Sequence, residues 1–171
     1  MYVNDNDGGF PAYANEVATP IYYWYDTFTP YIKSSQIFLC PVDSALYGRS
    51  NGGAYGVGVS CPWAPATGVA PIRCSYGANT SSGVTDSTKI VFMWATAWAN
   101  TGKIDAMVAP SNTIMLGDSK NYAYLQWIAA PRDTDVAYVH NDVANIGFCD
   151  GHVKPQAKGS LPSTWWTKDA T

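Results

Sequence analysis

The sequence predicts an α+β fold in which helical segments come first and an antiparallel β-sheet follows. Three observations lead to this prediction. The chain has 171 residues, 47% of them hydrophobic, so it is long enough to bury a core. Apolar residues recur at helical spacing near the N-terminus, whereas short strand-like runs dominate from Lys89 onward. No linker or internal repeat divides the sequence, and we therefore expect residues 1–171 to form a single domain.

The first expected element is the end of a helix within residues 1–8. Two glycines, Gly8 and Gly9, stop this helix, and Pro11 prevents it from restarting.

A second helix is expected over residues 20–34. Thr19 can cap this helix, and Pro20 suits its first position. The apolar residues at helical spacing are Ile21, Trp24, Phe28 and Ile32. Residues 36–41 should then continue as a short strand or extended segment.

A long irregular segment is expected over residues 43–87, which are rich in Gly, Ser, Asn and Pro. The strands expected within and after it are residues 74–79, 113–119, 122–129, 135–140 and 145–154, with 89–98 as either a strand or the start of a helix.

The last strand-like segment contains Asp150-Gly151, a pair that favours a two-residue type I′ hairpin turn. The side chains of this hairpin expected to face the core are Ile146, Phe148 and Val153. His140 is expected at the end of the preceding strand, with its ring bonded to the turn region. These roles are structural, so no catalytic residue is expected.

Charge and composition exclude two classes of partner. Charged residues make up only 13% of the chain, the net charge is −3, and the widest cationic cluster is Lys154, Lys158 and Lys168. Nucleic-acid binding needs a denser positive footprint. No run of about 18 apolar residues is present, so no membrane span is expected. The aromatic share of 14% suits an interface, a carbohydrate surface or an extracellular setting.

Four cysteines, an even number in a charge-poor chain, suit an oxidising compartment. Cys61 and Cys74 bracket a Pro- and Gly-rich loop and are the first expected disulfide. Cys40 and Cys149 would then form the second, which ties the early half of the chain to the late half. Four reduced, buried thiols remain the alternative.

The serine, histidine, aspartate and cysteine residues suggest two kinds of reactive site. A Ser119–His140–Asp150 trio would suit a hydrolase, but the chain lacks a G-x-S-x-G elbow. A zinc site is also conceivable, with Cys149 and His152 facing each other across the hairpin and Cys40 and His140 completing four ligands. Because C-x-x-C and the usual histidine spacing are absent, no metal site is expected.

Calcium and carbohydrate remain open alternatives. The stretch NDNDGGF fails the EF-hand template, since position one would be Val3 and position twelve Ala14. A different calcium site could use Asp5, Asp7 or Asp118 with backbone carbonyls. Tryptophans that could form a sugar-binding platform are Trp63, Trp94, Trp98, Trp127, Trp165 and Trp166.

Several short motifs occur together in one order. His140, nine further residues and Asp150-Gly151 match an H-x(9)-D-G signature. The other motif residues are Phe38, Cys40, Pro41 and Asp43 of F-x-C-P-x-D; Ser75, Tyr76, Gly77 and Asn79 of S-Y-G-x-N; and Asp118 and Ser119, which end a P-S-x-T-I-x-L-x-D-S strand. With this signature the chain resembles prepilin-type, type II secretion-like proteins over roughly residues 1–154.

The resemblance implies a pilin-like head made of the end of an N-terminal helix, a second helix and an antiparallel sheet with long loops. In that family an apolar N-terminal helix anchors the subunit in the membrane and then forms the filament core. The GFTLIELL-type leader is absent here, so residues 1–8 would be the end of that helix. The implied function is a structural, non-enzymatic subunit on the extracellular or periplasmic side of the envelope. Its partners would be other pilin or pseudopilin subunits, and it would need no cofactor.

Overall fold

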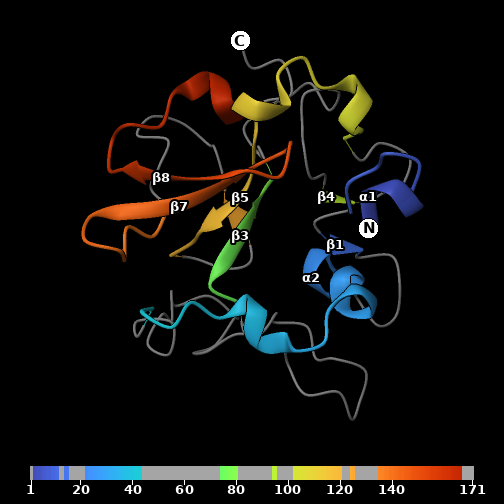
Figure 1. The fold of residues 1–171 in the computed structure, drawn as a ribbon, viewed down its shortest axis with the longest axis horizontal. Coiled ribbons are helices and arrows are strands. Elements are labelled where there is room, and N and C mark those ends of the chain that lie inside the picture. The colour runs from blue at the N-terminus through green and yellow to red at the C-terminus, as the bar shows by residue number, and fades with distance from the viewer. Residues whose placement is uncertain are drawn as a thin grey trace.

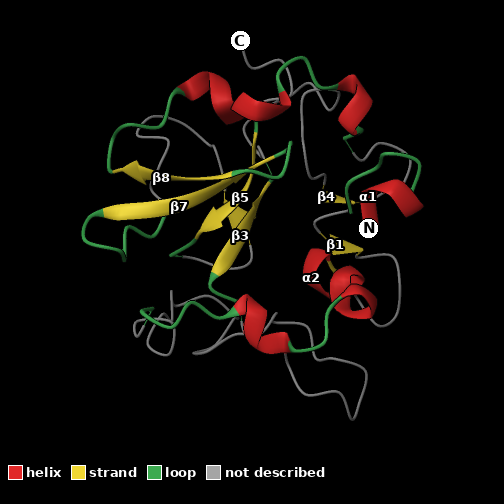
Figure 2. Ribbon diagram, viewed as in Figure 1, coloured by secondary structure: helices red, strands yellow, loops and turns green. Residues whose placement is uncertain are grey.

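The computed structural model describes residues 2–11, 14–15, 22–43, 74–80, 94–95, 102–120, 124–125 and 135–166. These residues combine short helices with a five-stranded sheet, so the predicted mixture of α and β elements is confirmed. In Figure 1 the sheet lies to the left, and α1 and α2 lie to its right. Figure 2 shows further short helices around the margins of the sheet.

The sheet has the strand order β6-β3-β5-β7-β8. Its strands are β3 (Tyr76–Asn79), β5 (Ile114–Asp118), β6 (Tyr124–Leu125), β7 (Val143–Phe148) and β8 (Val153–Ala157). The pairs β3–β5, β5–β7 and β7–β8 are antiparallel, and β6 runs parallel to β3 at one edge. The predicted strands at 74–79, 113–119 and 145–154 are therefore confirmed.

Of the other predicted strands, one is wrong and two are described only in part. The predicted strand over 135–140 is wrong, because Val136 makes only an isolated bridge to Ser119 and the chain then enters a turn. Within 122–129 and 89–98, the described strand residues are those of β6 and of β4 (Trp94–Ala95). The rest of both segments, and most of the loop predicted over 43–87, lie outside the described residues.

Each face of the sheet covers its own apolar cluster. Alternate residues of β7 point to one face, where the cluster comprises Ile114, Leu125, Val136, Ala144, Ile146, Phe148 and Trp166. The opposite face packs on the N-terminal helices, and its cluster comprises Phe10, Trp24, Tyr25, Phe38, Cys74, Ala78, Met107 and Cys149. Ile146 and Phe148 are buried as predicted, but Val153 is 65% exposed, so the prediction for that residue is wrong.

The N-terminal helix α1 spans Tyr2–Asp5, within the predicted range. Asp7 and Gly8 have φ values of 50° and 75°, and the Gly8 N–H donates to the Val3 carbonyl oxygen over 2.8 Å. This left-handed turn ends the helix, in the role predicted for the glycine.

The second predicted helix is much shorter than expected. Among the described residues of this range, α2 (Trp24–Phe28) is the α-helical part, and a 3₁₀ turn, η1 (Thr29–Tyr31), follows it. Pro30 lacks an N–H and disfavours α geometry in the residue before it, so the α-helix ends before the proline. Upstream, β2 (Tyr22–Tyr23) pairs instead with β1 (Ala14–Asn15), which in turn pairs with β4.

Residues 36–38 are also helical and not extended as predicted. They belong to η2 (Ser35–Phe38), whose first turn is capped by the Ser34 hydroxyl accepting from the Gln36 N–H. The chain becomes extended at Leu39, which leads into Cys40. Further 3₁₀ turns in the described ranges are η6 (Ile104–Ala106), η7 (Pro110–Asn112) and η8 (Ser163–Trp166).

The β7–β8 hairpin forms, but its turn differs from the prediction. Phe148 and His152 close the loop through the Phe148 N–H and the His152 carbonyl, leaving the three loop residues Cys149, Asp150 and Gly151. Of the predicted Asp150-Gly151 pair, only the glycine has positive φ, at 94°. The type I′ prediction is therefore wrong, and the loop is the three-residue kind that ends in a left-handed glycine.

Within the described part of the chain, the helices are too short or too polar to cross a lipid bilayer.

Candidate functional site

A two-residue turn places His140 at the start of β7. His140 and Val143 exchange backbone hydrogen bonds of 3.1 and 3.3 Å, and the two residues between them, Asn141 and Asp142, have φ values of 56° and 62°. Two consecutive positive φ values define a type I′ turn. This is the turn type that the sequence predicts for Asp150-Gly151, at the other end of β7. Asn and Asp adopt this conformation more readily than most residues, which explains why the chain turns here.

Asp118, the last residue of β5, is the most buried member of the site. It pairs with Tyr76 across the β3–β5 ladder, and its side chain is 1% exposed. Its Oδ2 atom accepts the Asn145 N–H over 2.6 Å. Its Oδ1 atom is also buried and has no hydrogen-bond partner among the described residues. Such an orphaned carboxylate oxygen is costly, because it gives up water without gaining a donor.

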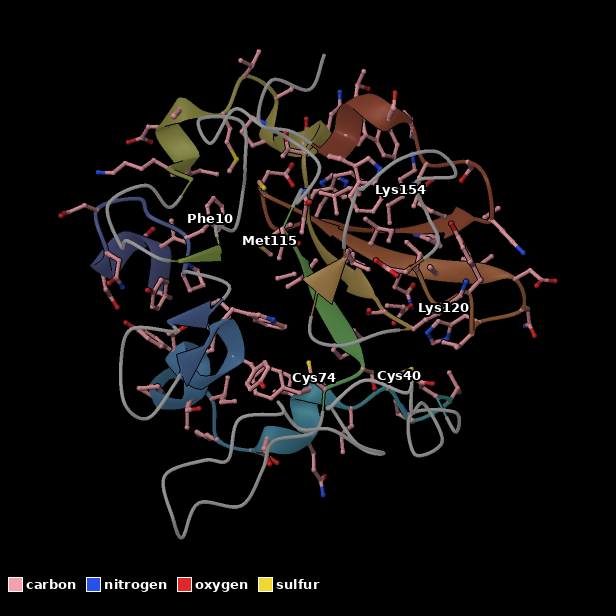
Figure 3. All side chains as sticks on the ribbon, turned by 180° about the vertical axis from the view of Figure 1, so that it is seen from behind. Phe10, Cys40, Cys74, Met115, Lys120 and Lys154 are labelled. Carbon is pink, nitrogen blue, oxygen red and sulfur yellow. The ribbon has the colours of Figure 1, made fainter. Side chains whose placement is uncertain are left out.

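Cys40 reaches the same place from the N-terminal half of the chain. Its backbone N–H donates to the Ser75 hydroxyl over 2.7 Å, and the Ser75 N–H donates to the Phe38 carbonyl over 2.7 Å. These bonds fix the segment after η2 against the start of β3. Figure 3 shows Cys40 where that segment meets the end of the sheet.

Three potential ligand atoms meet at this point. The His140 Nε2 atom lies 3.6 Å from the Cys40 Sγ atom and 3.3 Å from the Asp118 Oδ2 atom. Each of the three atoms is within 4.8 Å of the others. We call Cys40, Asp118 and His140 the Cys–Asp–His cluster.

The cluster is electrostatically unusual. Burial raises the pKa of Asp118, and the Asn145 N–H and His140 act in the opposite direction. Burial is also the main reason that the pKa of Tyr76 rises to about 12, and the nearby Cys40 and Asp118, in their ionised forms, raise it further. The tyrosine hydroxyl therefore stays protonated at neutral pH. Asp43 is 3% exposed, and its charge also raises the pKa of Asp118.

Residues of all four sequence motifs therefore converge at one end of the sheet. The buried members are Cys40 and Asp43, Ser75, Asp118 and Ser119, with Tyr76 and His140 partly buried. Other motif residues lie elsewhere: Pro41 is exposed, and Gly77 and Asn79 are buried in β3. The Asn79 amide donates to the carbonyls of Ile114 and Trp166 and so joins β3 to residues of the apolar cluster that contains Ile146 and Phe148.

The second histidine belongs to a separate, exposed pair. The Asp150 Oδ1 atom lies 2.6 Å from the His152 Nδ1 atom and accepts the His152 N–H over 3.1 Å. The His152 ring also stacks on Phe148, with centroids 4.4 Å apart. These bonds, first among them the backbone N–H, lower the pKa of Asp150.

The predicted contact of His140 with the Asp150-Gly151 turn is therefore wrong. His140 precedes β7 and Asp150 follows it, so the full length of the strand separates them. For the same reason Ser119, His140 and Asp150 do not assemble into a catalytic trio.

The cysteine predictions are also corrected in part. Cys40, Cys74 and Cys149 are free, buried thiols, so the predicted Cys40–Cys149 disulfide is not formed. Cys40 lies beside Asp118, which is bonded to Asn145, so Cys40 is near the position of Asn145 along β7. Cys149 is four residues further along the strand, and four extended residues span roughly 13 Å. A disulfide needs Cα atoms within about 7 Å, so the two cysteines are too far apart. Cys61, the predicted partner of Cys74, lies outside the described residues.

The other two buried thiols show little acidity. Burial raises the pKa of Cys74 to about 12, and its thiol donates to the Tyr76 carbonyl oxygen. Burial likewise raises the pKa of Cys149.

The four zinc ligands considered from the sequence do not come together in the structure. Cys40 and His140 come together, whereas Cys149 and His152 lie at the other end of β7. Asp118 takes the third position, whereas the sequence predicts it as a residue of the P-S-x-T-I-x-L-x-D-S motif and as an alternative calcium ligand, and not as a partner of Cys40 and His140. Asp5 and Asp7 do not join it: among the described residues, the Cys–Asp–His cluster is the group of three close ligand side chains. The available signal was that an aspartate ends an otherwise apolar strand.

The tryptophans give little surface for sugar stacking in the described part of the chain. Trp24 and Trp166 are buried, and Trp165 packs edge-on against Phe148 with ring centroids 5.4 Å apart. The side chains at the other candidate positions, Trp63, Trp94, Trp98 and Trp127, lie outside the described residues.

A second feature is an apolar groove of about 740 Å³ between the sheet and the N-terminal helices. Its helical wall includes Tyr2, Trp24, Phe28, Tyr31, Ile37 and Phe38. Its sheet wall includes Tyr76, Leu116, Asn145, Gly147 and Val153. Ile37 and Val153 are 63% and 65% exposed, so the groove opens to solvent between them.

Comparisons of the chain with protein-family models, with curated proteins and with solved structures find no match, so the pilin-like resemblance rests on the motif residues themselves.

Proposed function

We propose that this chain is the head domain of a pilin-like filament subunit of the type IV pilus or type II secretion kind. It works through contacts with neighbouring subunits and not through catalysis. The motif residues support the proposal, because residues of all four motifs meet at one end of the sheet, as parts of one shared architecture would, while Asp150 and Gly151 form the turn at the other end of β7. The main observation behind the proposal is the apolar groove, because a filament head needs a surface that binds another subunit.

The groove has the size and chemistry of a protein-binding surface. Monomeric proteins seldom expose large contiguous apolar areas unless a partner covers them. Here Tyr2 of α1 packs edge-on against Phe28 and Tyr31, with centroids 5.4 and 5.8 Å away, and the three rings form one wall. Aromatic residues of this kind are enriched at interfaces.

The occupant that fits best is an apolar helix of a neighbouring subunit. A helix laid in a groove buries one side chain per turn against each wall, and this is a common mode of recognition. Few charges line the groove, so an amphipathic or apolar helix would bind without leaving buried charges unpaired. Such a subunit would act on the extracellular or periplasmic side of the envelope.

The test is photo-cross-linking in the full-length protein, in the cell that makes it. A photoreactive amino acid is placed at Ile37 or Val153 in the groove, or at Val108 as a control. Val108 is 67% exposed and does not line the groove. We expect both groove positions to cross-link to another pilin-like subunit, identified by mass spectrometry, and the control to give no such product.

The proposal fails if the groove and control positions give the same products. It also fails if the coding sequence upstream of Met1 specifies a second globular domain where an apolar helix is expected.

A further inference from the structure

We propose that Cys40, Asp118 and His140 form a zinc-binding site. A thiolate, an imidazole and a carboxylate are the three ligand types that Zn²⁺ uses in proteins. The three ligand residues do not line the groove, and neither proposal depends on the other.

Two of the three distances between the ligand atoms match the edges of a zinc tetrahedron. Bonds of about 2.3 Å to sulfur and about 2.0–2.1 Å to nitrogen and oxygen, at tetrahedral angles, place sulfur and nitrogen about 3.6 Å apart and nitrogen and oxygen about 3.4 Å apart. The observed separations are 3.6 Å for Cys40 Sγ to His140 Nε2 and 3.3 Å for His140 Nε2 to Asp118 Oδ2. The third separation, between the Cys40 Sγ atom and the Asp118 carboxylate, is within 4.8 Å, whereas a tetrahedron needs about 3.6 Å, so a shift of at most about 1.2 Å lets one ion contact all three atoms.

Hydrogen bonding explains the same geometry less well. The His140 Nε2 atom faces both the Cys40 sulfur and the Asp118 oxygen, yet a ring nitrogen has either one proton or one lone pair. Its 3.3 Å distance to Asp118 exceeds the roughly 2.7–2.9 Å of a charge-assisted hydrogen bond. The exposed pair in the same molecule, Asp150 with His152, does reach 2.6 Å. A cation between the three atoms would interact with all of them at once.

The environment of the cluster is that of a site built to hold an ion. Asp118 is 1% exposed, and its second oxygen, Oδ1, has no hydrogen-bond partner among the described residues. Its first oxygen is held by the Asn145 N–H, and Ser75 fixes the backbone at Cys40. Second-shell bonds of this kind orient metal ligands. The His140 side chain is 29% exposed and leaves a route for the ion from solvent.

Zinc at this position would join three distant parts of the chain. Cys40 follows η2, Asp118 ends β5, and His140 begins the turn before β7. Binding releases the thiol proton of Cys40 to solvent, so zinc affinity falls in acid. Three protein ligands leave a fourth position for water or an added ligand.

The test is zinc binding by the purified, reduced and metal-free chain. Competition with a chromophoric chelator gives the stoichiometry and affinity, and thermal unfolding with and without zinc gives the stabilisation. We expect one zinc per chain and a higher melting temperature. The variants Cys40→Ser and His140→Ala should bind zinc at least 100-fold more weakly.

Matched controls and a second metal keep the test decisive even where a variant folds poorly. His152→Ala and Cys149→Ser remove the same residue types elsewhere and should bind zinc as the wild type does. Cobalt bound to the wild type should show the sulfur-to-metal charge-transfer band of a thiolate ligand. Absence of stoichiometric zinc, cobalt bound without that band, or equal losses in the control variants would each overturn the proposal.

Discussion

The two ends of β7 each present a histidine beside an aspartate, yet they produce opposite environments. At the upstream end, His140 meets Asp118, which lies 22 positions away in the sequence, together with Cys40. At the downstream end, His152 meets Asp150, which lies two positions away. The upstream aspartate is 1% exposed, whereas both side chains of the downstream pair are well exposed. Tertiary packing gathers one pair and local chain geometry gathers the other.

This difference explains the opposite pKa directions of the two aspartates. Burial dominates at Asp118 and raises its pKa, because the charged form loses hydration. Hydrogen bonds dominate at Asp150 and lower its pKa, because water still hydrates the carboxylate while the His152 N–H donates to it. The same two residue types therefore suit a ligand site at one end of the strand and a turn at the other.

The largest expected effect is a loss of folding stability at the downstream end of β7. Phe148 is 1% exposed and packs against Trp165 and His152. We expect Phe148→Ala to lower the free energy of unfolding by about 4 kcal/mol through lost burial and a cavity. His152→Ala, which removes the exposed partner, should cost less than about 1 kcal/mol. Urea denaturation of both variants would measure this, and similar losses would show that the polar pair contributes as much as the core.

A smaller effect is expected in the backbone of the downstream turn. Gly151 has φ +94°, and a Cβ built there would meet nothing within 4 Å. The cost of Gly151→Val is therefore conformational, and we expect a loss of about 2 kcal/mol. Gly151→Asn is the control, because asparagine tolerates left-handed geometry and should recover most of the loss. Equal losses for valine and asparagine would mean that the turn does not depend on positive φ.

The upstream turn should respond in the opposite direction. Asp142 has φ +62° at the second central position of a type I′ turn, where glycine is preferred. We expect Asp142→Gly to raise the free energy of unfolding by about 0.5 kcal/mol, because it relieves the strained backbone. Asp142→Ala keeps the strain and should lower it. Thermal unfolding of both variants checks the sign, and a loss for the glycine variant would contradict the assigned turn type.

The sequence could predict the local features of this strand but not its long-range partners. The Asp150-Gly151 pair predicted the hairpin and alternation predicted the burial of Ile146 and Phe148, because both features depend on neighbouring residues. The type I′ turn forms at Asn141-Asp142 and not at Asp150-Gly151 as predicted, since both pairs tolerate positive φ and the register decides between them. Asp118 was missed as a partner of His140 because only the β5–β7 pairing brings them together. The helix predicted over residues 20–34 is shorter for a similar reason, since Tyr22 and Tyr23 pair with the distant strand β1.

The smallest expected effect is the pH dependence of the exposed pair. The pKa of Asp150 is lowered in the folded protein, so the folded state binds fewer protons there than the unfolded state. Its contribution to stability is therefore complete above the ordinary aspartate value near pH 4, and it is lost as the pH falls through the lower folded value. Urea midpoints of the wild type and Asp150→Asn, measured from pH 2 to 6, should differ most at the upper end and converge in acid.

Salt and a partner variant separate this effect from general acid unfolding. Because the Asp150 side chain is exposed, the part of the difference due to charge should shrink as ionic strength rises, whereas the part due to the His152 backbone N–H should remain. In the His152→Ala background the backbone donor is kept and the imidazole is lost. The convergence should then persist with a smaller amplitude, since the backbone bond is the largest cause of the lowered pKa. A difference that grows in acid would mean that the turn favours protonated Asp150, and the two ends of β7 would no longer differ in sign.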